Sequence, residues 1–241
     1  MEISLRAVGL EKIYRGRKVV DGIDIELRQG EVVGLLGPNG AGKTTTFYML
    51  VGLIKPHRGG IFLNGTEITR TPMYRRARMG MGYLSQESSI FRKLTVEQNL
   101  LSILETIPIS EEERARRLDD LLNELNLDHL RKNKAYSLSG GEKKRLEITR
   151  ALVSEPRYML MDEPFAGVDP LTVDDVQSII SRLRDKGIGV LITDHNVRET
   201  LEITNRAYIM FEGKTILSGD AETLIHDPKA RELYLGEDFR M

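Results

Sequence analysis

A glycine-rich segment leads directly into a lysine and a run of hydroxyl side chains. Its sequence, Gly37-Pro38-Asn39-Gly40-Ala41-Gly42-Lys43-Thr44, matches the pattern G-x-x-x-x-G-K-[ST], and Thr45 follows it. Glycines allow the backbone N–H groups of such a loop to surround a phosphate, and a helix that begins at its end adds the positive end of its dipole. Lys43 is then placed for the outer phosphates of a nucleotide, and the Thr44 hydroxyl for Mg²⁺. The alternative is a glycine-rich turn with a surface lysine, which the flanking strand and helix patterns disfavour.

Two adjacent carboxylates form the second chemical feature. The apolar run Tyr158–Met161 is typical of a buried parallel strand, and Asp162 and Glu163 follow it directly. Ligands of open α/β sheets bind at the carboxyl ends of the strands. Asp162 is therefore expected to hold Mg²⁺, directly or through water, and Glu163 to act as the general base on an attacking water. The alternative interpretation is two solvated acids in a turn.

A second anion-binding helix start is predicted in the middle of the chain. In Leu138-Ser139-Gly140-Gly141-Glu142, Ser139 and Glu142 have the spacing of a capping box. Ser139 is expected to cap a helix, while Gly140 and Gly141 leave its first amides uncovered. The sequence thus contains two helix starts that suit phosphate, although a flexible loop before a helix has the same pattern.

The surrounding pattern predicts an α/β domain that positions these residues. Alternating and continuous apolar runs predict strands, and these alternate with helical segments, which favours an open and largely parallel sheet. The region 95–134 shows no strand alternation and is expected to be helical. Within it, Ser110 and Glu113 have the spacing of a capping box. The predicted strands are 3–8, 23–27, 32–36, 81–86, 158–161 and 189–193, with short strands around Asn64-Gly65 and a hairpin of 206–211 and 215–218. The other predicted helices are 43–52, one after Ser139, 170–186 and 196–203.

Composition excludes several classes of function. The chain has 241 residues with 35 basic and 36 acidic side chains, a formal net charge of −1, and no cysteine. The near-neutral balance disfavours nucleic-acid binding, and the missing cysteines exclude thiol catalysis, disulfides and cysteine zinc sites. The uncharged stretch Thr44–Ile54 is far too short to span a bilayer. We therefore expect a cytoplasmic protein without direct membrane insertion.

The order of the three motifs resembles that of ATP-binding cassette (ABC) ATPases, over essentially the whole chain. This resemblance implies one cassette over 1–241, with a RecA-like, mainly parallel core sheet and an antiparallel β subdomain. A helical signature subdomain at about 88–155 would be inserted in the core, and a short C-terminal tail at 235–241 would follow. It also implies ATP and Mg²⁺ as cofactors. A head-to-tail homodimer would hold two ATP molecules, with the Ser139 segment of each copy on the γ-phosphate bound by the other.

Further site residues follow only from the resemblance. Tyr14, which lies 29 residues before Lys43, would stack on adenine, unless it is simply a strand-end tyrosine. Gln86 would touch Mg²⁺ or the lytic water, although Ser85 stands where many cassettes have proline. Asp169 would couple the two sites of the dimer. His195 would contact the γ-phosphate, whereas a lone histidine is more often structural.

The expected roles divide into three sets. Catalysis is assigned to Lys43, Gln86, Glu163 and His195. Metal binding is assigned to Thr44, Gln86 and Asp162. Nucleotide binding is assigned to Tyr14, Gly37, Pro38, Asn39, Gly40, Ala41, Gly42, Lys43, Thr44, Thr45, Ser139, Gly140, Gly141 and Asp169.

A closer resemblance concerns the ATPases of lipopolysaccharide export systems. It is carried by 47–49, 89–92, 164–170, 193–200 and the tail segment 234–240. The resemblance implies two membrane-spanning partner subunits and a peripheral position on the cytoplasmic face of the inner membrane. The partners would dock in a groove near Gln86, Phe91 and Arg92. Ile90 could take part in that groove or simply pack against the helical subdomain.

Three other interpretations remain open. The ATPase of a branched-chain amino acid importer is very similar in length and motifs. A soluble ABC ATPase of DNA repair or translation is a rival of another class, but such proteins usually carry coiled coils, tandem cassettes or basic surfaces. A nucleotide-binding regulator without turnover is disfavoured by the presence of Lys43, Asp162, Glu163 and His195.

Overall fold

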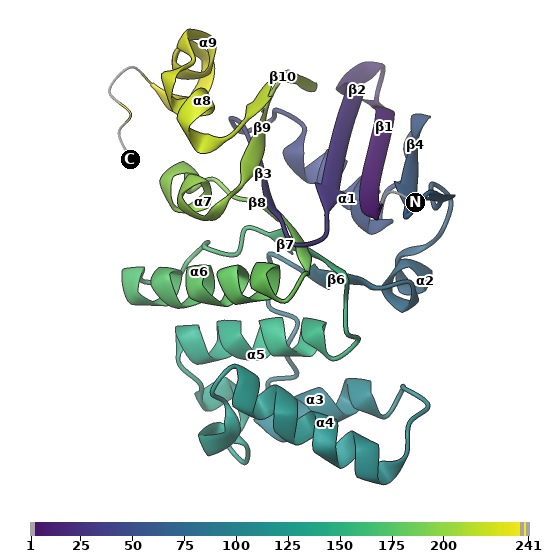
Figure 1. The fold of residues 1–241 in the computed structure, drawn as a ribbon, viewed down its shortest axis with the longest axis vertical. Helices are drawn as coiled ribbons and strands as arrows, with labels where there is room; N and C mark the ends of the chain where they lie inside the picture. Colours follow the sequence, from purple (N-terminus) through teal and green to yellow (C-terminus); the bar gives the residue numbers. More distant parts are fainter. Residues whose placement is uncertain (1–2, 237–238, 240–241) are drawn as a thin grey trace.

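Two β-sheets and a group of helices make up the part of the chain that the structure, a computed structural model, describes: residues 3–236 and 239. Figure 1 shows the antiparallel strands on one side, the core strands in the middle, and the helices α3, α4 and α5 stacked at the far end of the long axis. The helices α7, α8 and α9 lie at the opposite end, beside the last strands. The arrangement is the α/β fold that the alternating pattern predicts.

The larger sheet has six strands in the order β10-β9-β3-β8-β7-β6. Five of them are parallel, and only the β9–β10 pair is antiparallel. Every residue of β3, β7 and β8 is buried, which explains their continuous apolar sequences. The bounds are β3 Val32–Leu36, β6 Met81–Leu84, β7 Tyr158–Asp162, β8 Gly189–Thr193, β9 Arg206–Phe211 and β10 Lys214–Gly219.

The smaller sheet is antiparallel, with the order β2-β1-β4-β5. In its two longest strands, β1 and β2, exposed and buried positions alternate over much of their length, as expected for a sheet with one face in solvent. Its strands are β1 Ser4–Tyr14, β2 Arg17–Arg28, β4 Arg58–Leu63 and β5 Thr66–Glu67. One buried cluster joins the inner face of this sheet to the core sheet through the helix α1.

Nine α-helices and three short helical turns complete the described residues. The helices are α1 Lys43–Val51, α2 Met73–Arg78, α3 Val96–Leu104, α4 Glu111–Glu124, α5 Gly140–Leu152, α6 Pro170–Asp185, α7 Val197–Ile203, α8 Ala221–His226 and α9 Pro228–Ala230. The turns are η1 Asp128–Leu130, η2 Ala135–Ser137 and η3 Arg231–Leu235. None of the helices in 3–236 or at 239 is both long and apolar enough to cross a bilayer.

The helices α3, α4 and α5 share an apolar core of their own, to which Ile90 and Leu146 contribute. The helical subdomain expected at about 88–155 includes these three helices, and its bounds stay a prediction. The expected box at Ser110 forms only in part. Its hydroxyl accepts the Glu113 N–H at 3.2 Å, but the Glu113 carboxylate pairs with Arg116 instead of the Ser110 backbone. The tail lies largely outside the described residues, which end at Gly236 apart from Phe239.

Candidate active site

The core sheet gathers the strand-end residues at one edge. Residues paired across neighbouring parallel strands include Asp162 with Thr193 and Leu35 with Thr193. The segments that follow β3, β7 and β8 therefore leave the sheet side by side. Because β6 pairs with β7 in the same direction, Gln86 follows at this edge as well, two residues beyond the end of its strand. The register thus brings the glycine-rich loop, the carboxylate pair, His195 and Gln86 together.

Close backbone approaches explain two glycines of the loop. Gly37 has a φ of 145°, and a Cβ there would overlap the carbonyl oxygen of Met210. Gly42 has a φ of 100°, and a Cβ there would overlap the carbonyl oxygen of Val19. Both positions therefore exclude side chains, by conformation and by space. Gly42 is also the residue before α1, so the loop ends at the N-terminus of that helix.

The turn between β9 and β10 is hydrogen-bonded to the glycine-rich loop. The N–H of Gly213 at the hairpin tip donates to the carbonyl of Ala41 at 3.0 Å. The carbonyl of Gly213 accepts the N–H of Asp21 at 2.8 Å, which ties the tip to β2. Both sheets therefore hold the shape of the phosphate loop.

Lys43 lies buried within the loop. Its ammonium donates to the carbonyl of Gly37 at 2.6 Å and to that of Pro38 at 3.1 Å. Burial lowers the pKa of Lys43, while the charges of Glu163 and Asp194 act in the opposite direction. The side chain is thus a desolvated cation at the centre of the site, where its attraction for phosphate is strong.

Asp162 is buried at the end of β7, and its Oδ2 has no hydrogen-bond partner. Burial raises its pKa to about 6, helped by the nearby charges of Glu163 and Asp194, while a hydrogen bond with the Tyr48 hydroxyl lowers it. A buried carboxylate oxygen without a partner is costly, and a divalent cation would satisfy it. Together with the exposed hydroxyl of Thr44, it offers the hard oxygen ligands that Mg²⁺ prefers, so the residues present fit this ion.

Glu163 contacts three other residues of the site, namely Thr193, Gln86 and His195. Its φ of 49° lies in the left-handed region, and its N–H donates to the Thr193 carbonyl at 2.6 Å. Its Oε2 accepts Nε2–H of Gln86 at 2.9 Å, and Nδ1 of His195 lies 3.4 Å from the same oxygen. Such a strained conformation in a non-glycine residue is typical of functional sites. Both partners contact the same oxygen, Oε2, of a side chain that is partly exposed.

Asp194 binds backbone groups of two segments next to Glu163 and His195. It is fully buried, and its carboxylate accepts the N–H groups of Phe165 and Asn196, both at 2.9 Å. It therefore fixes the loop that follows Glu163 and the start of α7. Burial raises the pKa of Asp194, while these backbone hydrogen bonds lower it.

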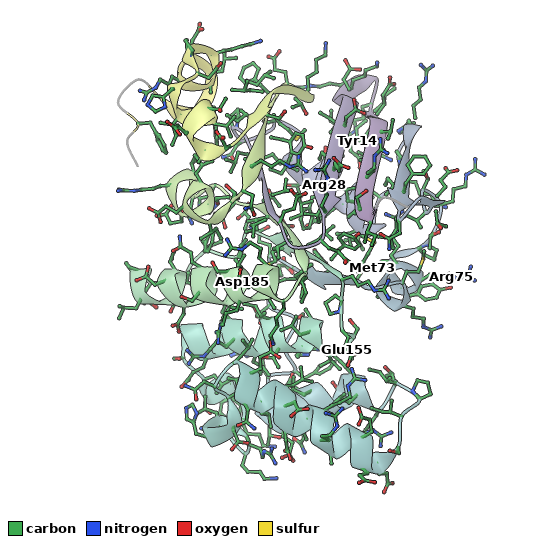
Figure 2. The ribbon with its side chains drawn as sticks, viewed as in Figure 1. Tyr14, Arg28, Met73, Arg75, Glu155 and Asp185 are labelled. Carbon is green, nitrogen blue, oxygen red and sulfur yellow. The ribbon has the colours of Figure 1, made fainter. Side chains whose placement is uncertain are left out.

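The other expected nucleotide contacts lie on different elements. Ser139 and Asp169 precede the neighbouring helices α5 and α6, and both cap them: Ser139 with a complete capping box, and Asp169 through bonds to Thr172. A Cβ on Gly141 would come within 2.9 Å of the Thr172 hydroxyl, so the two helix starts are adjacent. Tyr14 is the last residue of β1, and its side chain is 45% exposed. The ammonium of Lys12 lies over its ring, 5.2 Å from the ring centre. Figure 2 shows Tyr14 in the antiparallel sheet, away from the helical end.

Comparison with known proteins assigns the family. The family model for "ABC transporter" matches residues 20–166, more than half of the chain. The chain belongs to the ABC transporter family, as its ATP-binding cassette. A "Probable ABC transporter ATP-binding protein" of Azorhizobium caulinodans is 55% identical over 100% of this chain and 85% of its own length. The "Lipopolysaccharide export system ATP-binding protein LptB" of Acidithiobacillus ferridurans is also 55% identical, over 98% of both chains.

A solved structure gives the same assignment for the fold. The crystal structure of the ADP conformation of an ATP-binding cassette of an ABC transporter has a TM-score of 0.88 and 31% identity, over 98% of this chain and 100% of that one. The expected cassette fold is therefore confirmed. The matched family makes this ABC cassette an ATP-binding and ATP-hydrolysing subunit of a transporter.

Two features of the cassette were not anticipated from sequence. The hydroxyl of Tyr48 on α1 lies near the Asp162 carboxylate and near the hydroxyl of Tyr83, so both groups affect the pKa of Tyr48. Arg76 on α2, a helix that the periodicity did not predict, is buried beneath α1. The only signal was a stretch without acids, 68–86, in which several arginines lack a local partner.

Replacing Asp162 by asparagine is expected to make the nucleotide-free cassette more stable and inactive at once. The pKa of Asp162 is raised to about 6 from 3.8, so the folded chain binds more protons than the unfolded chain between these values. Stability therefore falls as the pH rises through this window, by at most about 3 kcal/mol. The neutral amide removes that cost, and the melting temperature at pH 7.5 should rise by several degrees.

The measurement is thermal unfolding of both proteins at pH 7.5 and pH 5, with ATPase assays at pH 7.5. The gain should shrink at pH 5, where the native carboxyl is mostly protonated. A variant that is less stable than the native chain at both pH values would contradict the assignment of a costly buried charge.

Proposed function

We propose that this cassette hydrolyses ATP to drive the extraction and export of lipopolysaccharide from the inner membrane of a bacterium. The convergence of Gln86 and His195 on Glu163 is the observation that carries the hydrolytic part. The cargo is supported by the 55% identity to a relative named as a lipopolysaccharide export ATP-binding protein. The motif resemblance in 89–92 and 193–200 points in the same direction.

Hydrolysis would proceed with little covalent chemistry by the protein. A water beside the Glu163 carboxylate loses its proton to this group as its oxygen attacks the γ-phosphorus. The bond from that phosphorus to the oxygen bridging the β- and γ-phosphates breaks at the same time, so ADP leaves with the bridging oxygen and inorganic phosphate forms. Gln86 and His195 hold the carboxylate in place, and His195 also faces the γ-phosphate. Lys43 and the loop amides bind the phosphates. Mg²⁺, held by Thr44 and Asp162, would neutralise charge on the phosphate oxygens.

A second copy of the chain would complete each site. Ser139 caps α5 with its hydroxyl and leaves the glycine amides at the helix start, an arrangement that suits a phosphate of ATP bound to the other copy. Asp169 caps the adjacent α6, so it lies beside the same helix start. Tyr14 remains our candidate for stacking on adenine, because its ring is exposed at a strand end.

The membrane partners would dock beside the segment 88–94, which we call the Phe91 loop. Ile90 is buried in the helical core, so it packs inward, while Phe91 is half exposed. Phe91, Arg92, Lys93 and Leu94 line a shallow hollow. A groove between α2, β6 and α5 lies in the same region and includes Arg150. An exposed aromatic ring flanked by cations is the type of anchor that interfaces use, and this position would hold the cassette at the cytoplasmic face of the membrane.

Purification of the cassette with its membrane subunits tests the proposed cargo. We expect two membrane-spanning proteins and a bound lipopolysaccharide, identified by mass spectrometry of the extracted lipid. Recovery of a periplasmic amino acid receptor and its permeases would instead support the importer interpretation. Recovery of the cassette without any membrane protein, from mild detergent, would contradict both.

A further inference from the structure

The Phe91 ring is held by an arginine from another element. Phe91 is 50% exposed, and the guanidinium of Arg150 lies 4.8 Å from the centre of its ring. The same guanidinium donates to the backbone carbonyl of Ser89 and, at 3.3 Å, contacts its hydroxyl. Burial lowers the pKa of Arg150. The side chain therefore gives up much of its hydration for contacts with this one loop.

The backbone of the same residue is fixed from the opposite side. Asn99 on α3 is fully buried, and its side-chain amide forms two hydrogen bonds with the backbone of Phe91. Its oxygen accepts the Phe91 N–H at 2.8 Å, and its nitrogen donates to the Phe91 carbonyl at 3.1 Å. A third bond joins Asn99 to the Thr95 carbonyl at 2.9 Å. The loop thus has a rigid backbone anchor on α3, while its ring depends on Arg150.

Arg150 belongs to the helix that begins at Ser139. The helix α5 has 13 residues, so it spans about 20 Å from its capped start to its last turn, which contains Arg150. It is a continuous α-helix that packs against α6, as Figure 1 also shows. One end of this helix is the candidate contact for ATP of the second copy, and the other end holds the Phe91 ring. A shift of the helix start would therefore move the guanidinium as well.

We propose that Arg150 is a positioning residue that couples the Phe91 loop to nucleotide bound at the start of α5. This inference rests on the proposed function, since it takes both the dimer contact at Ser139 and the docking role of the Phe91 loop from it. When ATP contacts the start of α5, the helix moves as a unit and Arg150 carries the change to Ser89 and Phe91. A partner seated on Phe91 influences the helix start through the same contact, because coupling between two sites is reciprocal.

Simple packing is the competing explanation, and stability alone does not distinguish the two. Truncating Arg150 removes a cation–π contact and a hydrogen bond in either case. Only coupling predicts that the loop stops responding to nucleotide while nucleotide binding and pairing of the chains persist. The decisive readout is therefore the ATP-dependent change in the loop, measured at 88–94, rather than the melting temperature.

Amide hydrogen exchange of the full chain tests the proposal. Glu163→Gln is the background, so that ATP is retained, and exchange at 88–94 is compared with and without ATP and Mg²⁺. We expect ATP to change exchange there by at least about threefold, because exchange reports the local opening of this segment. Adding Arg150→Met should abolish that change while ATP still produces the dimer, and Arg150→Lys should keep part of it, because lysine retains one donor and a cation.

Arg116→Met provides the matched control. Arg116 lies on α4 in the same helical group, and its ion pairs join only Glu113 and Asp120 of its own helix among the described residues. This variant should respond to ATP like the background. A full ATP response at 88–94 in Arg150→Met, or no response in the background despite dimer formation, overturns the coupling role. Failure of the background to form a dimer with ATP would instead overturn the proposed dimer site.

Discussion

Replacing Glu163 by glutamine should reduce ATP turnover to below about 1% of the native rate, since a general base contributes about 10²- to 10⁴-fold. The amide keeps the size of the side chain and can still bond Gln86, whose Nε2 lies 2.9 Å from Oε2 in the native chain. It cannot accept the proton of the attacking water. Nucleotide binding should persist, so the variant should accumulate an ATP-bound dimer, detected by light scattering after size-exclusion chromatography.

Glu155→Gln is the matched control for this experiment. Glu155 precedes the same strand β7 that Glu163 follows, and it has the same φ of 49°. Its carboxylate pairs with Arg117, and Figure 2 shows it at the border of the helical end. Turnover should stay within about twofold of the native value, because an exposed pair contributes little. Native-like turnover by Glu163→Gln would refute its role as the base.

Replacing Arg76 by methionine should lower the free energy of unfolding by about 3–5 kcal/mol, the range for a disrupted buried polar network. Arg76 is 1% exposed. All five of its N–H groups donate to backbone carbonyls: Met49 at 2.9 Å, Leu50 at 2.5 Å, Ile68 at 2.8 Å, Thr69 at 3.2 Å and Thr71 at 2.8 Å. Methionine fills much of the volume, but each carbonyl loses the donor that Arg76 supplies, and the Ile68 carbonyl keeps the Thr71 N–H.

The position of the charge adds to this expected loss. Met49 and Leu50 are in the last turn of α1, where the helix dipole favours a cation. Burial lowers the pKa of Arg76 to about 10, so the group remains charged at neutral pH. The variant should melt about 10 °C lower, at about 2–4 °C per kcal/mol for a chain of this size.

Arg75→Met is the control for Arg76→Met, because it removes the same group from the next residue of the same helix. Arg75 is exposed, and Figure 2 shows it pointing away from the molecule at the outer end of α2. Its guanidinium lies 5.8 Å from the Tyr74 ring, and its loss should change stability by less than about 1 kcal/mol. Urea unfolding followed by circular dichroism measures both. Equal urea midpoints for the two variants would contradict a stabilising role for the bonds from buried Arg76 to the backbone carbonyls.

Features set by local chemistry were predictable from the sequence. The buried strands β3, β7 and β8 appear as uninterrupted apolar runs, and the helix start at Ser139 has its capping partner three residues away. The phosphate loop is specified by glycines at positions where side chains do not fit. Even the convergence at the sheet edge follows from parallel strands that end in polar residues.

Features set by contacts between distant segments were not predictable. The donor from Gln86 to Glu163 joins residues 77 positions apart, and sequence spacing says nothing about which oxygen it meets. Arg76 gave no helical pattern because its short helix has few apolar positions, and its acceptors are backbone atoms that carry no sequence signal. The Ser110 box failed in part for a local reason, since Arg116 competes for the carboxylate of Glu113.

The bond between Gly213 and Ala41 has a consequence for how nucleotide enters. A loop whose curvature is already imposed by two sheets loses little conformational entropy when a ligand arrives. Binding of the phosphates by a single copy should then be fast and have only a small heat-capacity change. The larger loss of conformational freedom should come later, when two copies of the chain pair.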